Sequence, residues 1–291
     1  DYGQMKGRGG GVGDTNHNPY KRKAKELFLD FFNIQDERRK RHGNEDDFAD
    51  SDGEEDDGVY QSWIWGRGED KVQVILLDTR WSRSKFTQTN ETRETNGQTH
   101  DPNARILSED QWKWLELQLG KEARIRLIVS SIQVLTDGSK DECWRMIPNE
   151  RTRLEKMLQR VLLNSSTILI SGNRRVGGIY QSNGLIEITS SSLTHTIPSR
   201  KKCSLQDGAT EEGCASSSSF SDDEFDQNRV DQLVRVNNFG SIEIDWLNDE
   251  VTIALRKADA TPGFSHWEGY SNAIPLTDAG MVLQSHSFPI P

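Results

Sequence analysis

Long apolar runs are missing from this sequence, and its basic residues do not gather beside aromatic ones. No run of about 18 apolar residues occurs, so the sequence predicts no transmembrane segment. The 291 residues carry a net charge of −10 without a basic stripe interleaved with aromatics, which argues against a nucleic-acid partner. The chain starts at Asp1 with neither an initiator Met nor a signal-peptide pattern, so we expect the later part of a longer protein.

Cysteine is also scarce, with three residues in the chain. Cys203 and Cys214 flank a short polar loop and are candidates for a disulfide, whereas Cys143 precedes Trp144 in an expected packed segment. Three unpaired thiols fit the sequence equally well. Both alternatives therefore stay open.

Apolar residues are few but concentrated in regular patterns. Hydrophobic content is 33% and the mean hydropathy is −0.76, while helical and strand patterns alternate without a clear linker. We therefore predict one α/β domain over residues 1–291. The polar excess is assigned to three disordered loop insertions, at 5–18, 36–57 and 199–227.

The periodicity of apolar residues predicts the regular elements of this domain. Helices are expected over 21–32, from Ser108 as N-cap with Gln111 completing a capping box, and over 150–163. Strands are expected over 72–77, 125–135, 167–170, 185–189, 230–236, 241–246 and 251–255, with a turn at 237–240.

The most informative stretch is Ser166–Tyr180, a short apolar strand that ends at a Ser-Gly pair. Ile168–Ile170 is typical of a buried strand, and the loop that follows reads Ser-Gly-Asn-Arg-Arg up to Arg175, with glycines to Gly178. Loops that leave the carboxyl ends of strands in open α/β sheets are common ligand-binding positions. This loop is therefore the first candidate for a functional site.

The loop resembles the metal-binding signature of the PhoD-like alkaline phosphatases, a branch of the metallophosphoesterases, in which Ser-Gly-Asp-x-His follows a strand. Asn173 stands at the Asp position and Arg175 at the His position. Further segments agree with that family in order and spacing, over nearly the whole chain. They are Leu27–Phe32, Gly58–Ser62, Val74–Arg80, Gln111–Glu116, Ile128–Gln133, Pro148–Arg151, Glu187–His195 and Asn238–Gly240.

The resemblance implies a layered α/β/β/α sandwich and hydrolysis of a phosphate ester with divalent or trivalent metal ions such as Ca or Fe. It also implies a secreted protein or one of the secretory pathway. Such hydrolysis needs a nucleophilic water and positive charge over the phosphoryl oxygens, and clustered metal ions supply both.

The metal ligands that the resemblance implies are partly replaced. Asn173 keeps a carbonyl oxygen, a weak neutral ligand, whereas Arg175 has no lone pair and adds a cation. His195 is a further candidate ligand, with a structural histidine as the alternative. We expect weakened metal binding.

The start of the chain departs from the family motif in the same way. By resemblance, Asp1 is a catalytic-site carboxylate that orients a preceding His, and Tyr2 is a substrate-binding residue. Met5 and Lys6 replace the Asn-Asp pair of the motif. Methionine is a poor ligand for hard cations, and the lysine adds a positive charge.

Arginines remain as candidates for binding phosphoryl oxygens. Arg80 leaves a strand end close to Asp78 and is the expected catalytic cation, although an ion pair of Asp78 with Arg80 or Arg83 is the structural alternative. Arg174, in the signature loop, is the expected substrate-binding cation. Ser131 and Gln133 either line the pocket or satisfy backbone groups.

Three hypotheses follow. The first is a metal-dependent phosphate-ester hydrolase whose activity is impaired in this chain. The second is a non-catalytic pseudo-phosphatase in which Arg174, Arg175 and Lys6 bind phosphate or a phosphorylated partner. The third is a decaying or mis-assembled gene. The fold resemblance favours the first hypothesis, and the substituted site residues favour the other two.

Overall fold

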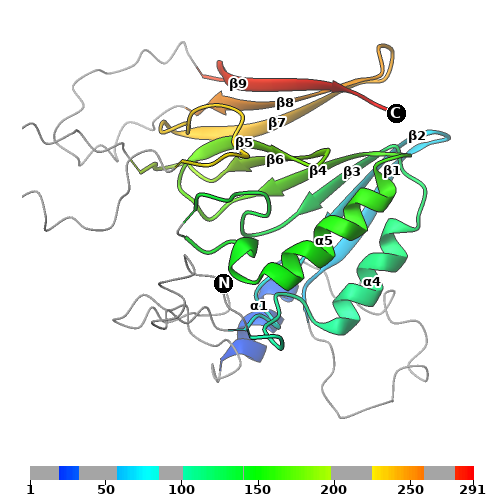
Figure 1. Cartoon of the computed structure of the whole chain (residues 1–291), viewed down its shortest axis with the longest axis vertical. Helices are drawn as coiled ribbons and strands as arrows, with labels where there is room; N and C mark the ends of the chain where they lie inside the picture. The colour runs from blue at the N-terminus through cyan, green and yellow to red at the C-terminus, as the bar shows by residue number, and fades with distance from the viewer. Residues whose placement is uncertain (1–19, 33–57, 85–100, 140, 198–224, 259–278) are drawn as a thin grey trace, which may run out of the picture.

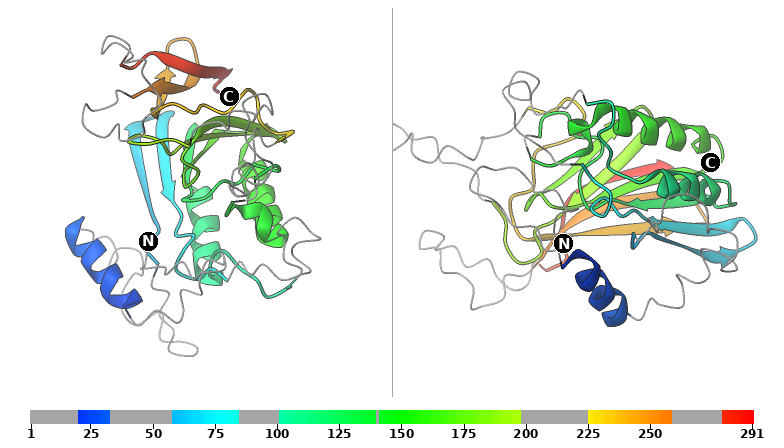
Figure 2. Two further views of the ribbon diagram at one scale, coloured as in Figure 1. Left: turned by 90° about the vertical axis from the view of Figure 1, so that its left-hand side faces the viewer. Right: turned by 90° about the horizontal axis from the view of Figure 1, so that it is seen from below.

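The structure is a computed structural model that describes residues 20–32, 58–84, 101–139, 141–197, 225–258 and 279–291. Within these ranges, a six-stranded sheet and a three-stranded sheet lie face to face, and two helices cover the other face of the larger sheet (Figure 1). The predicted α/β sandwich is therefore confirmed. In the described part of the chain, no helix lies on the outer face of the smaller sheet (Figure 2).

The elements fall into three groups. The helices are α1 (Lys21–Phe31), α4 (Glu109–Leu119), the short 3-10 helix η2 (Trp144–Met146) and α5 (Pro148–Val161). The larger sheet contains, in spatial order, β1 (Gln61–Arg67), β2 (Asp70–Leu76), β3 (Ile125–Val129), β4 (Ser166–Ser171), β6 (Leu185–Ser190) and β5 (Gly177–Ser182). The smaller sheet contains β7 (Asn238–Asp245), β8 (Glu250–Lys257) and β9 (Val282–Pro289). None of the described helices is long and apolar enough to cross a membrane.

Strand direction determines where a site can form. Strands β2, β3, β4 and β6 are parallel to one another, while β1 and β5 pair antiparallel at the two edges. The carboxyl ends of β2, β3 and β4 therefore meet at one edge of the sheet. Loops leaving that edge are brought together although they are far apart in the sequence.

Two apolar layers hold the sandwich together. On the helix side, Trp112, Leu115 and Leu154 pack against strand residues such as Ile128, and all four are at most 1% exposed. Between the two sheets, the core is made of residues from β3, β4, β5, β6 and β8, including Ile125, Ile168, Ile179, Ile186, Ile188, Val251, Ile253 and Leu255. Strands buried on both faces explain the near-continuous apolar runs of the sequence.

Helix α4 begins where the sequence predicts, but its capping differs. Ser108 Oγ accepts the backbone N–H of Gln111 at 3.1 Å, as an N-cap does. The Gln111 side chain does not complete the capping box. It instead bonds the backbone of Asp78, accepting from its N–H at 2.8 Å and donating to its carbonyl at 3.0 Å. Gln111 therefore joins α4 to the loop after β2.

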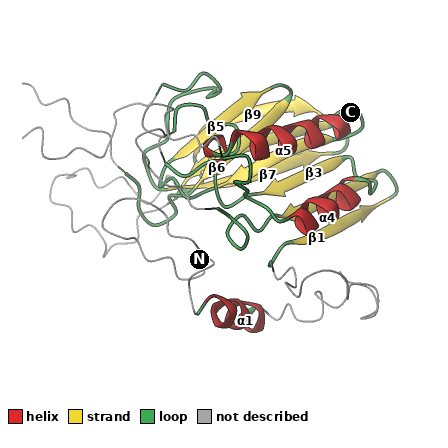
Figure 3. Cartoon of the chain, turned by 60° about the horizontal axis from the view of Figure 1, so that its bottom comes forward, coloured by secondary structure: helices red, strands yellow, loops and turns green. Residues whose placement is uncertain are grey.

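Helix α1 stands apart from the two packed helices (Figure 3). It contacts the loop after β2 through Lys21 and Lys25, whose Nζ atoms lie 4.1 Å and 4.5 Å from the centre of the Trp81 ring. Both lysines are buried.

The predicted strand 125–135 is too long. Strand β3 ends at Val129, because Ser130 Oγ donates to the carbonyl of Ile132 at 2.6 Å and the chain turns away from the sheet. The backbone N–H groups of Val134 and Leu135 then bond the carboxylate of Glu187 at 3.0 Å and 2.6 Å. Burial raises the pKa of this Glu187 carboxyl above its usual range, and the hydrogen bonds oppose that shift.

The predicted strand 230–236 and the predicted turn at 237–240 are also wrong. Residues 230–236 make one isolated bridge to β5, between Val234 and Gly177. The expected turn is the first part of β7, because Asn238 N–H bonds the carbonyl of Ser192 at 2.9 Å and starts the strand. The apolar pattern does not distinguish a strand from an extended segment that lies along a sheet.

Three strands have no counterpart in the prediction, namely β1, β5 and β9. Strand β5 begins at Gly177, within the stretch that the sequence assigns to a loop. A Cβ atom on Gly177 would lie 3.0 Å from Asn238 Oδ1 and from Leu255 Cδ1, so glycine permits close packing of the two sheets. Gly177 therefore serves the packing of the two sheets rather than the flexibility of a loop.

The predicted insertions 5–18 and 36–57 lie outside the described residues, as does most of 199–227. The third insertion is predicted to end at residue 227, which is too late. Residues 225–227 are described, and Asp226 is buried. Cys143 is buried as expected, whereas Cys203 and Cys214 lie outside the described residues.

Glu150 offers a test of the helix layer. Its carboxylate accepts the backbone N–H groups of Ile106 and Leu107 at 2.7 Å and 3.0 Å, and the Trp112 indole N–H at 3.2 Å. We predict that Glu150→Ala lowers the free energy of unfolding by about 3 kcal/mol, because three buried donors lose their acceptor. Urea denaturation measures this loss. The control Glu116→Ala removes an exposed carboxylate and should cost less than about 0.5 kcal/mol; equal losses would contradict the prediction.

Candidate functional site

Three loops meet at the carboxyl ends of β2, β3 and β4. The first and second are joined by a hydrogen bond between the hydroxyls of Thr79 and Ser131. The second and third are joined by Gln133, whose Oε1 accepts from Arg174 Nη1 at 2.9 Å. Gln133 is fully buried and also donates from Nε2 to Thr189 Oγ1 at 2.9 Å. These side chains fix the loops relative to one another.

Asp78 shapes the loop after β2. Its carboxylate accepts three backbone N–H groups at 2.9 Å each, from Val59, Arg80 and Trp81. This acceptor satisfies amides that no longer belong to a strand. The side chains of Arg80 and Arg83, which follow in this turn, both reach the carboxylate of Glu142.

The centre of the site is the carboxylate of Glu142, in the segment just before η2. Its Oε2 atom lies 3.0 Å from Arg80 Nη1 and 3.4 Å from Arg83 Nη1. The amide nitrogen of Asn173 donates to the same oxygen at 3.4 Å. Three side chains from two different loops therefore direct N–H groups at one oxygen atom.

The three charged side chains of this cluster are largely shielded from water, whereas Asn173 is exposed. The side chains of Glu142, Arg80 and Arg83 are 15%, 13% and 2% exposed. Burial, and then repulsion from Arg80, lowers the pKa of Arg83 to about 10, while Glu142 opposes the shift. Arg83 remains a cation at neutral pH. Charged hydrogen bonds in such a shielded place are stronger than the same contacts in water.

The signature loop presents its three polar side chains in different directions. Asn173 and Arg175 both adopt left-handed backbone conformations, with φ of 65° and 54°. Asn173 reaches Glu142, whereas Arg175 is exposed and its carbonyl accepts from Thr196 Oγ1 at 3.0 Å. Between them, Arg174 is 6% exposed. Left-handed conformations are uncommon for residues other than glycine, and here they set these directions.

Arg174 is held by several partners inside the protein. Besides Gln133, its Nη1 donates to the Ser139 hydroxyl, and its Nε lies 3.2 Å from Asp141 Oδ2. Its backbone N–H bonds Ser191 Oγ at 3.0 Å. Asp141 and Glu142 are consecutive, so two neighbouring carboxylates face the arginines of two loops.

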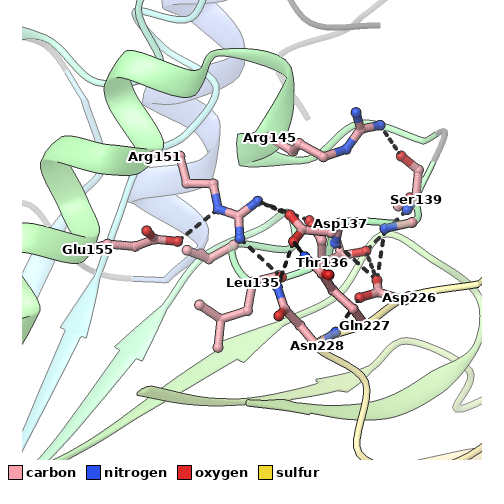
Figure 4. Close-up of polar contacts among 12 residues, drawn as sticks. Leu135, Thr136, Asp137, Ser139, Arg145, Arg151, Glu155, Asp226, Gln227 and Asn228 are labelled. Carbon is pink, nitrogen blue, oxygen red and sulfur yellow. Dashed lines mark hydrogen bonds and ion pairs between the residues drawn. The ribbon is translucent and has the colours of Figure 1, made fainter. Parts of the chain in front are cut away.

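A polar network supports the segment that carries these carboxylates (Figure 4). Asp226 Oδ2 accepts from Thr136 Oγ1 at 2.6 Å and from the N–H groups of Asp137 and Gly138 at 3.0 Å and 3.1 Å. Arg151, on α5, bonds Asp137 Oδ1 at 2.6 Å. Its Nε bonds Glu155 Oε1 at 2.8 Å. Residues 134–139 are thereby anchored from both sides.

The structure places the residues predicted from sequence as follows. Asn173 and Arg80 meet at Glu142, and Arg174 lies beside them through Gln133 and Asp141. Asp1, Tyr2, Met5 and Lys6 lie outside the described residues. His195 is exposed, and its Nδ1 lies 3.1 Å from the hydroxyl of Thr194.

The described donor set does not fit a metal ion. Arg175 supplies no lone pair, and Asn173 directs an N–H group toward Glu142. Among the residues that the structure describes, no group of three or more His, Cys, Asp and Glu side chains is placed to hold a metal. The cluster presents N–H donors, which suit an anion.

Sequence reasoning missed Glu142 and Asp141. The two acids precede the buried Cys143-Trp144 pair, but no spacing or motif in the sequence relates them to Arg80 or Asn173. They reach the site because Trp144 N–H bonds the carbonyl of Gln133 at 2.9 Å, which brings their segment back to the end of β3. That contact is a property of the fold.

Comparison with solved structures finds several similar chains, including the two that follow. Superposition on a structure described as PhoD gives a TM-score of 0.52 at 15% identity, covering 80% of this chain and 42% of that one. The GAP50 protein, described as the anchor in the inner membrane complex of Plasmodium, gives a TM-score of 0.47 at 14% identity over 80% of this chain and 55% of that one. No family model and no curated protein matches the sequence. The chain therefore shares the α/β sandwich fold of that PhoD structure.

Asp226 offers a test of the network beneath the site. We predict that Asp226→Ala lowers the free energy of unfolding by about 2 to 3 kcal/mol, because the three donors that contact its Oδ2 lose their acceptor. It should also speed hydrogen exchange at the amides of Asp137 and Gly138. Asp231→Ala is the control, since Asp231 is exposed and its carboxylate accepts a local N–H, from Gln232 at 2.7 Å. Unchanged exchange in Asp226→Ala would contradict the proposed anchoring.

Proposed function

We propose that this protein binds a phosphate group at the Arg80, Arg83 and Asn173 cluster of a phosphoesterase-type fold and does not hydrolyse it at an appreciable rate. The ligand is a phosphate ester or a phosphorylated partner. One observation carries the proposal. Three N–H donors converge on one carboxylate oxygen, Glu142 Oε2, at the edge of the sheet where the PhoD-like resemblance implies a metal.

The direction of the N–H groups in the cluster supports an anionic ligand. Arg80, Arg83 and Arg174 supply three guanidinium groups, Asp141 and Glu142 pair with them, and Asp78 also acts on Arg83. Three acids thus balance three arginines, so the support comes from the N–H donors aimed at one oxygen and not from a positive net charge. Arginine suits phosphate because its planar group can direct two N–H bonds at two oxygens.

The chemistry of hydrolysis is less well supported. A metal-activated water would require oxygen or nitrogen lone pairs at the ends of the strands, and Asn173 and Arg175 present N–H groups instead. The second candidate function, metal-dependent hydrolysis of a phosphate ester, rests on the PhoD-like resemblance and fold. A secretory location, which the same resemblance implies, stays part of the proposal.

Phosphate binding provides the direct test. We predict that the wild-type protein binds inorganic phosphate in calorimetric titration, and that Arg80→Gln weakens this binding about tenfold, because a charged donor to the ligand is lost. Arg153→Gln is the matched control. Arg153 forms an exposed bidentate pair with Glu109, at 2.5 Å and 2.9 Å, and lies on α5 away from the cluster. Equal effects of the two substitutions, or no binding by the wild-type protein, would refute the proposal.

Metal content and turnover separate the two candidate functions. We predict substoichiometric metal in the purified protein by elemental analysis, and very slow hydrolysis of p-nitrophenyl phosphate. Asn173→Asp combined with Arg175→His should increase metal binding, because both replacements supply lone pairs. Stoichiometric metal together with rapid, chelator-sensitive turnover by the wild-type chain would instead establish the hydrolase.

A further inference from the structure

A groove lies between the two sheets, where the carboxyl ends of β4 and β6 meet the start of β7. Its volume is about 460 Å³, within the range of roughly 300 to 1,000 Å³ that small-molecule sites occupy. Apolar side chains make up much of its wall, namely Ile170, Ile188, Leu193, Phe239 and Ile242. The groove opens at the same edge of the larger sheet as the cluster described above.

Three of the polar side chains in the wall use their donors within the protein. Ser190 Oγ donates to Asn238 Oδ1 at 2.8 Å, and Asn238 Nδ2 donates to the carbonyl of Val236 at 2.8 Å. Ser191 Oγ donates to the carbonyl of Val176 at 3.1 Å. A polar ligand group would lose its bonds to water and find these donors occupied, so the groove favours an apolar group.

Gly240 leaves space in this groove at a position of β7 that would otherwise carry a core side chain. Side chains alternate along a strand, so position 240 shares a face with Ile242 and Ile244, which pack in the core between the sheets. A Cβ atom on Gly240 would lie 3.5 Å from Ile188 Cδ1 and 3.6 Å from Ser190 Cβ, which are ordinary contact distances. Its φ is not in the left-handed region. Neither packing nor conformation requires glycine here among the described residues, and a glycine inside a strand is typical where a ligand approaches closely.

The groove and the cluster share the signature loop. Ser191 Oγ, in the wall of the groove, accepts the backbone N–H of Arg174 at 3.0 Å, and that nitrogen is bonded directly to Asn173 of the cluster. Ile170, also in the wall, precedes Asn173 by three residues, so their Cα atoms are at most about 11 Å apart. Gly172 lies between them and has no side chain. An organic group attached to a phosphate in the cluster can therefore reach the groove.

We propose that the groove binds the apolar organic group of a small phosphate ester whose phosphate lies at Arg80, Arg83 and Asn173. The inference rests on the proposed function and names the ligand class of that site. The N–H donors hold the phosphate, and the groove selects the organic group by the apolar surface that it buries. Gly240 provides the space that this group occupies.

The test compares hexyl phosphate with methyl phosphate, which are both dianions at about pH 8 and differ in apolar surface. By calorimetric titration we expect the wild-type protein to bind hexyl phosphate at least about tenfold more tightly, because burial of about two methylene groups supplies that factor. In Gly240→Val the new side chain fills part of the groove, and the preference should fall below about threefold. Gly240→Ala should lose a smaller part of the preference.

A second measurement locates the organic group. In the wild-type protein, hexyl phosphate should shift the NMR signals of the δ1 methyl groups of Ile170, Ile188 and Ile242, which line the groove. Methyl phosphate should leave these signals in place, since its organic group is too short to enter the groove.

The matched control is Gly120→Val. Gly120 follows α4 and precedes β3, so it lies at the opposite edge of the larger sheet from the groove. A Cβ atom there would lie 3.5 Å from the carbonyl oxygen of Leu117, which is the same degree of crowding as at Gly240. The preference should remain at the wild-type value in this variant. If Gly240→Val does not fold by circular dichroism, Gly240→Ala and the methyl shifts of the wild-type protein decide.

The outcomes separate the two levels of the proposal. Phosphate binding that depends on Arg80, with equal affinity for hexyl and methyl phosphate, overturns the role of the groove and leaves the proposed function standing. A preference for hexyl phosphate that the Gly240 variants do not reduce, or that leaves the isoleucine methyl signals unshifted, also overturns it. Absence of binding of inorganic phosphate and of both esters removes the proposed function together with the inference.

Discussion

Buried carboxylates that accept backbone N–H groups hold the loops at the working edge of the larger sheet. Asp78 serves the loop after β2, Glu187 the loop after β3, and Asp226 the segment that follows it. Each replaces the strand pairing that the backbone loses where it leaves the sheet, because an unpaired buried N–H is costly. The positions of Arg80 and of residues 134–139 depend on these acceptors.

The loops held in this way present N–H donors, whereas a metal centre presents lone pairs. Arg80, Arg83 and Asn173 direct N–H groups at Glu142, so the edge of the sheet is arranged around a negative oxygen. The sandwich itself does not impose this choice. A fold positions loops, and the side chains on those loops decide whether a cation or an anion is bound.

Prediction from sequence succeeded where a pattern is local. Ser108 caps α4, and the apolar run at Ile168 forms buried β4. It failed where a residue's role is set by distant neighbours. Gly177 indicated a loop, but it lies in a strand because Asn238 and Leu255 of the second sheet approach it closely. Residues 230–236 have strand-like apolar spacing, yet they lie along β5 with one isolated bridge, at Val234.

The sequence by itself determined the α/β class and the strand that carries the signature loop, and its PhoD-like resemblance implied that Asn173 and Arg175 stand at metal-ligand positions. It also identified Arg80 and Arg174 as cations of interest. Only the tertiary structure decided what these residues face. Glu142 is about thirty to sixty positions away from its partners along the chain, and parallel strands with coincident ends bring them together. Contacts of that kind leave no periodicity in a sequence, because they depend on how loops meet after the core has packed.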